Sequence, residues 1–140
     1  MTVCSAIYGL VLIYETLLSE GRYVPGDLNR EPNFKILGLK RFYVMNFWHL
    51  EFHQLAFFLG ELIGNFLLLI PFPFMVYYFF KRKIPDFLMV VLIFCTTVTI
   101  ETLQLFFKIG YFDIDDILLN FIGGIVGIIF FNFIYRKFLL

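Results

Sequence analysis

The chain has 140 residues, of which 61% are hydrophobic and only 16% are charged. Soluble domains carry roughly 45–50% apolar and about 25% charged residues, so a chain of this size in water would expose an aggregating apolar surface. The composition therefore excludes an ordinary soluble domain. The eleven Lys and Arg residues balance the eleven Asp and Glu residues, which gives no support for a nucleic-acid partner.

Four apolar runs approach the length of about 20 residues that a helix needs to cross a bilayer. They predict an all-α bundle of four transmembrane helices, folded as a single domain over residues 1–140, with the lipid bilayer as its partner. Pro71 and Pro73 fall inside the second run, where proline is expected to kink the helix. The predicted spans are residues 2–18, 62–80, 87–107 and 117–135.

Residues 19–61 are predicted to form a long external loop. Residues 42–59 are rich in aromatic side chains but are interrupted by polar ones. This mixture predicts a helix lying at the membrane surface, with Trp48 in the aromatic belt; a re-entrant hairpin is the alternative. His49 and His53 are four residues apart, but two ligands do not close a metal site, so we predict a surface pair and no bound metal.

Basic residues predict the orientation of the chain. They are dense in two short stretches at helix ends and sparse in the long loop, where acids lie among them. Because cytoplasmic segments carry the excess of Lys and Arg, we predict that both termini are cytoplasmic. The dense stretches are Lys81, Arg82 and Lys83 in one turn, and Arg136 and Lys137 at the end of the last span.

Carboxylates and amides gather at the opposite face. Antiparallel helices bring the end of one span beside the start of the next, so polar residues at these ends meet. Glu101 lies six residues before Phe107, or about 9 Å inside its span at about 1.5 Å per residue. An ionisable group at such a depth is expected to face the bundle interior. The candidate ligand-binding residues are Asn65, Glu101, Gln104, Asp113, Asp115, Asp116 and Asn120, with Glu15 at the same face.

Glycines on the last span are predicted to pack helices together. Gly123 and Gly127 form a G-x-x-x-G motif with Gly124 between them. Small residues at this spacing let helix backbones approach closely in lipid.

These motifs carry a family resemblance. The pair E-x-x-Q (Glu101 and Gln104), the run F-D-I-D-D-I-L-L-N at residues 112–120 and the G-G-x-x-G that follows resemble the signature of the VanZ-like membrane proteins. The stretch G-N-F-L-L-L-I-P-F at residues 64–72 is similar to a second motif of that family. The family usually has an arginine just before its F-D-x-D-D run, where this chain has Ile-Gly-Tyr at residues 109–111.

The resemblance implies a multi-pass protein of the bacterial plasma membrane and cell envelope. The family is named for a protein that gives low-level resistance to the glycopeptide antibiotic teicoplanin. We therefore expect an outer-face pocket that binds a lipid-linked envelope component or a glycopeptide, with no cofactor. The alternatives are a membrane enzyme, such as a metal-assisted hydrolase or transferase acting on a lipid, a structural subunit of a membrane complex, and a purely structural polar clasp between helices.

Overall fold

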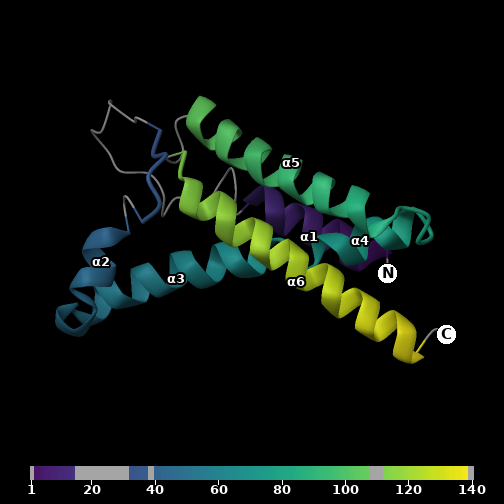
Figure 1. The fold of residues 1–140 in the computed structure, drawn as a ribbon, viewed down its shortest axis with the longest axis horizontal. Helices are drawn as coiled ribbons and strands as arrows, with labels where there is room; N and C mark the ends of the chain where they lie inside the picture. The colour runs from purple at the N-terminus through teal and green to yellow at the C-terminus, as the bar shows by residue number, and fades with distance from the viewer. Residues whose placement is uncertain (1, 15–31, 38–39, 108–111, 139–140) are drawn as a thin grey trace.

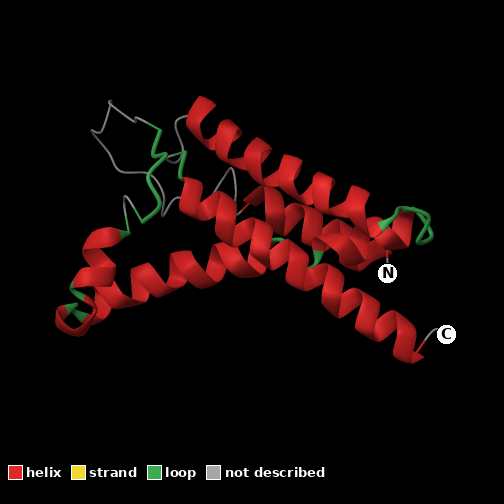
Figure 2. Cartoon of the chain, viewed as in Figure 1, coloured by secondary structure: helices red, strands yellow, loops and turns green. Residues whose placement is uncertain are grey.

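A computed structural model describes residues 2–14, 32–37, 40–107 and 112–138 of the chain. These residues form helices and no strand, which confirms the all-α prediction (Figures 1 and 2). In chain order the elements are α1 (Thr2–Ile13), α2 (Arg41–Met45), the 3-10 helix η3 (Phe47–His49), α3 (Phe52–Leu68), α4 (Phe72–Phe79), α5 (Asp86–Phe106) and α6 (Ile114–Phe138).

Three helical stretches in the described part of the chain are long and apolar enough to cross a membrane. They are Phe52–Phe79, which combines α3 and α4, Asp86–Phe106 and Ile114–Lys137. The protein is therefore of the multi-pass membrane type. The described part of the first predicted span is the 12-residue α1, and residues 15–18, including Glu15, lie outside the described residues.

The second span begins at Phe52, well before the predicted start at residue 62. Glu51 and Gln54 form a reciprocal capping box, in which the Glu51 backbone N–H donates to the Gln54 side chain at 3.2 Å. These polar residues are therefore the start signal of α3, so the second half of residues 42–59 belongs to the helix that continues into the second span. The first half forms α2 and η3, and its placement at the membrane surface stays a prediction.

Proline divides the second span into two helices. α3 ends at Leu68 and α4 begins at Phe72, with Pro71 as its N-cap residue. Between them the backbone tightens into hydrogen bonds from Ile70 N to Leu67 O and from Phe72 N to Leu69 O, both 3.2 Å long. Because proline has no N–H, the expected kink is a complete break of the helix.

The apolar core lies where α4, α5 and α6 meet. Leu69, Tyr77, Met89, Ile93, Ile100 and Ile128 are its buried members, together with Ile84. α1 joins the bundle at the end of α3, where the Tyr8 hydroxyl donates to the Leu68 carbonyl at 2.8 Å. In Figure 1 the end of α5 and the start of α6 lie together, while the chain N-terminus lies toward the opposite end of the bundle.

Glycines set the close approach of α6 to its neighbours. A Cβ added at Gly123 would overlap the backbone carbonyl of Phe66, and one added at Gly127 would overlap that of Ile70. A Cβ at Gly124 would overlap the side chain of Ile93 on α5. The three glycines therefore pack α6 against α3, the α3–α4 break and α5.

Arg82 fixes the turn between α4 and α5 onto α6. Its guanidinium pairs with Asp86 at 2.7 Å and donates to the side-chain carbonyl of Asn132. It also lies 4.2 Å from the centre of the Tyr77 ring. Its backbone has φ 59°, in the left-handed region, as the tight turn requires.

Candidate functional site

Asp113 begins α6 and organises the polar end of the bundle. Its side-chain Oδ1 accepts from the backbone N–H of Asp115 at 3.0 Å, and its backbone carbonyl accepts from Asp116 N and Ile117 N at 3.2 Å. Aspartate is a preferred N-cap residue because it satisfies N–H groups that the first helical turn leaves unpaired. α6 therefore begins at Ile114, earlier than the predicted start at residue 117.

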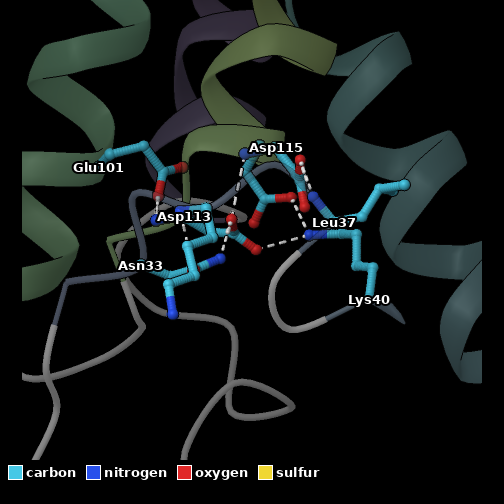
Figure 3. Close-up of polar contacts among 8 residues, drawn as sticks. Asn33, Leu37, Lys40, Glu101, Asp113 and Asp115 are labelled. Carbon is cyan, nitrogen blue, oxygen red and sulfur yellow. Dashed lines mark hydrogen bonds and ion pairs between the residues drawn. The ribbon is translucent and has the colours of Figure 1, made fainter. Parts of the chain in front are cut away.

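Residues 32–37 lie against this helix start. The backbone of Asn33 pairs with residues 112–114 through hydrogen bonds of 2.8 and 3.1 Å, and its side-chain amide donates to Asp113 at 2.9 Å. Leu37, with φ 56°, donates its N–H to Asp115 Oδ1 at 2.9 Å. Figure 3 shows these loop residues converging on the two aspartates.

Lys40 supplies the positive charge among these acids. Its Nζ lies 2.8 Å from Asp113 Oδ2 and 2.8 Å from Asp116 Oδ1, and the residue is only 3% exposed. Burial lowers the pKa of Lys40, but the charge of Asp116 and the hydrogen bonds to both aspartates outweigh that effect and raise the pKa above its ordinary value.

Sequence reasoning missed the role of Lys40, which it counted only as one of the dispersed loop cations. The lysine is more than 70 residues away from both aspartates in sequence. The one available signal was the lack of an arginine before residue 112, which left the acids without a local partner.

α5 contributes a buried polar stripe. Thr97, Glu101 and Gln104 are each at most 1% exposed, as their spacing of four and three residues on one helix face allows. Glu101 Oε2 accepts from the backbone N–H of Asp113 at 3.2 Å. The structure therefore brings Glu101 of α5 to the start of α6.

Asn120 and Asp115 keep polar atoms unsatisfied inside the protein. Asn120 is 1% exposed, and neither its Oδ1 nor its Nδ2 has a hydrogen-bond partner in the described structure. Asp115 is 6% exposed, and its Oδ2 also has no hydrogen-bond partner in the described structure. Leaving a buried donor or acceptor unpaired costs about 1–3 kcal/mol, so these atoms need an explanation.

Asn65 is buried on α3 at 2% exposure, next to Phe66, whose carbonyl faces Gly123 of α6. Asn65 thus lies in the stretch of α3 that packs on α6.

The described residues contain no group of three or more His, Cys, Asp or Glu side chains arranged to hold a metal ion. His49 is exposed in η3, and His53 Nδ1 lies 3.3 Å from Glu51 Oε2 with both side chains about three-quarters exposed.

Comparison with known families identifies a family model that matches this chain. The model of the family described as VanZ/LLP1 matches residues 5–135, nearly the whole chain. No curated protein and no solved structure gives a significant match.

Proposed function

This chain belongs to the VanZ/LLP1 family of membrane proteins, and we propose that it binds the polar headgroup of a lipid-linked envelope component, or a glycopeptide such as teicoplanin. The proposed binding residues are Glu101 and Gln104 on α5 and Asp115 and Asn120 on α6, all of them buried, and we term this set the α5–α6 polar cluster. In this proposal the cluster opens to the outer face of the bacterial plasma membrane, and both termini are cytoplasmic.

The unsatisfied amide of Asn120 carries the proposal. A buried primary amide offers two donors and one acceptor, and in the described structure Asn120 uses none of them. A purely structural clasp would pair these atoms, because hydrogen bonding across the interface is the source of its stability. An amide that is buried and unpaired is instead suited to a ligand that both donates and accepts hydrogen bonds.

The two carboxylates of the cluster define the chemistry of the ligand in this proposal. Asp115 Oδ2 is an acceptor without a donor, and Glu101 adds a second carboxylate near the start of α6. Hydroxyl, amide and ammonium groups donate to carboxylates, whereas phosphate groups are repelled by them. The sugar–peptide part of a cell-wall precursor and the body of a glycopeptide are both rich in the donating groups.

Asp113 and Asp116 have a different role in this proposal. Both pair with Lys40, and Asp113 also caps α6 and accepts from Asn33. They support the loop that lies over the cluster and are not themselves ligand contacts. We therefore propose that these two of the seven candidate ligand-binding residues hold the loop in place and do not bind the ligand.

The test separates binding from stability with Asn120→Leu. Leucine fills a similar volume without polar atoms, so it removes the cost of the unpaired amide and is expected to leave the free energy of unfolding unchanged or raised. Binding of labelled teicoplanin and of lipid-linked precursor to the purified protein is expected to fall about 5-fold to 150-fold, as two lost hydrogen bonds of about 0.5–1.5 kcal/mol each imply.

Thr102→Val is the matched control, because Thr102 is exposed on α5 and its hydroxyl donates to Val98 O of the same helix. The control is expected to bind like the wild type. Equal binding by Asn120→Leu and the wild type would refute the proposal, and a loss of stability in Asn120→Leu would identify a structural amide instead.

A further inference from the structure

Exposed apolar side chains gather at the end of the bundle that carries the α5–α6 polar cluster. Figure 1 shows residues 32–37, α2 and the start of α3 on the left of the view, at the same end as the start of α6. A contiguous aromatic surface of this kind rarely faces water, so it calls for a partner. We term the set the apolar belt, whose members are between 58% and 90% exposed: Phe34, Ile36, Phe42, Met45, Trp48 and Phe52.

Contacts on the inner side hold the belt in this position. Asn33 N donates to Phe112 O at 2.8 Å, and the Phe34 ring centre lies 5.4 Å from that of Phe112. Tyr43 of α2 stacks on the buried Phe58 of α3, with ring centres 5.3 Å apart. The belt side chains are therefore exposed on backbone segments that are already anchored to α6 and α3.

The apolar belt is continuous with a membrane-spanning stretch. Phe52 belongs to the belt and is also the first residue of Phe52–Phe79, which is long and apolar enough to cross a membrane. In a bilayer, the residues just before Phe52 would lie where the hydrocarbon gives way to headgroups. Exposed charged residues, Lys35, Arg41 and Glu51, are interleaved with the belt. Aromatic side chains beside charged ones are typical of this boundary, because the rings are apolar while the charges stay hydrated.

We propose that the apolar belt lies at the boundary between headgroups and acyl chains, and that the α5–α6 polar cluster takes its ligand from the plane of the membrane. The sequence predicts a membrane-surface segment only within residues 42–59 and assigns residues 32–37 to an external loop. Phe34 and Ile36 extend the apolar surface to that loop, and so to the start of α6.

One hydrogen bond connects the belt to the cluster. The backbone N–H of Leu37 donates to Asp115 Oδ1 at 2.9 Å, which holds this carboxylate at the level of the belt. Resting on the proposed function, the inference selects a lipid-linked envelope component over a glycopeptide dissolved in water. Only the lipid-linked ligand is held by its own chain with its polar part at headgroup depth.

Tryptophan fluorescence measures the depth of the belt without any ligand. Trp48 is the only tryptophan of the chain, and Phe34→Trp in a Trp48→Phe background reports on residues 32–37. The proteins are reconstituted in phosphatidylcholine vesicles that contain lipid brominated either near the headgroup or near the chain end. We expect both tryptophans to show blue-shifted emission, stronger quenching by the shallow bromines and weak quenching by acrylamide in the water.

Phe94→Trp, also in the Trp48→Phe background, is the matched control. Phe94 is 52% exposed near the middle of α5, so the tryptophan there is expected to be quenched more strongly by the deep bromines. Strong quenching by acrylamide at positions 34 and 48 would place the belt in water and overturn the proposal. Protection of both positions from acrylamide and from bromine would indicate a protein contact, such as a second copy of the chain, and would overturn it as well.

Binding in the same vesicles tests the route of the ligand. Phe34→Ser with Ile36→Ser is expected to lower the affinity for lipid-linked precursor about 5-fold, because polar side chains no longer hold residues 32–37 at headgroup depth. Binding of the same precursor without its lipid is expected to stay unchanged, and the control Lys35→Ser is expected to bind both forms like the wild type. Equal losses for the two forms would overturn the membrane route. Failure of both forms to bind the wild type, with the tryptophans at headgroup depth, would refute the proposed function and confirm the belt.

Discussion

Removing the ammonium of Lys40 is expected to destabilise the polar end of the bundle strongly. Lys40→Met keeps the length and apolar stem of the side chain but deletes both 2.8 Å ion pairs. The side chains of Lys40 and Asp113 are only 4% and 3% exposed, so solvent screens the pair little. Breaking a buried pair on one side leaves the other charge unpaired and costs about 3–5 kcal/mol.

The assay is equilibrium unfolding of purified protein in mixed micelles, titrated with a denaturing detergent and followed by far-UV circular dichroism. Lys35→Met is the matched control, because Lys35 is exposed in the same loop and its replacement is expected to change stability by less than about 0.5 kcal/mol.

A double-mutant cycle tests whether the two aspartates cause the loss of stability in Lys40→Met. In a protein that already carries Asp113→Asn and Asp116→Asn, Lys40→Met is expected to cost less, with a coupling energy of about 0.5–3 kcal/mol. The reasoning is refuted if Lys40→Met unfolds like Lys35→Met, or if its cost is the same with and without the two aspartates.

Two further predictions concern packing and pH. Gly123→Ala is expected to lower the free energy of unfolding by about 1–3 kcal/mol in the same assay, because the added Cβ would overlap the Phe66 carbonyl. Gly64→Ala is the control and is expected to be neutral or stabilising, because nothing lies within 4 Å of its added Cβ. Equal effects of the two variants would contradict the close approach of α6 to α3. The pKa of Lys40 in the folded protein is raised above its ordinary value of 10.5. The contribution of the Lys40 charge to the free energy of unfolding is therefore complete below pH 10.5 and is lost only as the pH rises through the pKa of the folded protein. The stability difference between wild type and Lys40→Met is therefore expected to be constant from about pH 7 to about 9, and a fall within that range would contradict the raised pKa.

Periodicity along single helices was the strongest guide to this fold. The stripe of Thr97, Glu101 and Gln104 is visible in the sequence, and all three side chains are buried. The G-x-x-x-G of α6 likewise lies where Gly123 meets another backbone. Both features depend only on residues three or four apart, which a helix places on one face whatever surrounds it.

Helix boundaries and the ion pair were harder to predict, for different reasons. Polar residues at 51–54 were interpreted as an interruption of the apolar pattern, although the same residues form the capping box of α3. The last span was predicted to begin at residue 117, so Asp113 was not recognised as the residue that caps α6. Lys40 is more than 70 residues away from the aspartates in sequence, and no local sequence pattern predicts a contact at such a separation.

The most direct test of the account observes the Asn120 side chain itself. Protein labelled with ¹⁵N-asparagine in micelles is titrated with lipid-linked precursor or teicoplanin, and the side-chain amide signals are followed by NMR, with Asn120→Leu used to assign the signal. We predict that the Asn120 signal shifts with ligand while that of Asn132, which is bonded to Arg82 and Asp86 at the other end of α6, stays fixed. An Asn120 signal that does not move at saturating ligand would contradict the central claim.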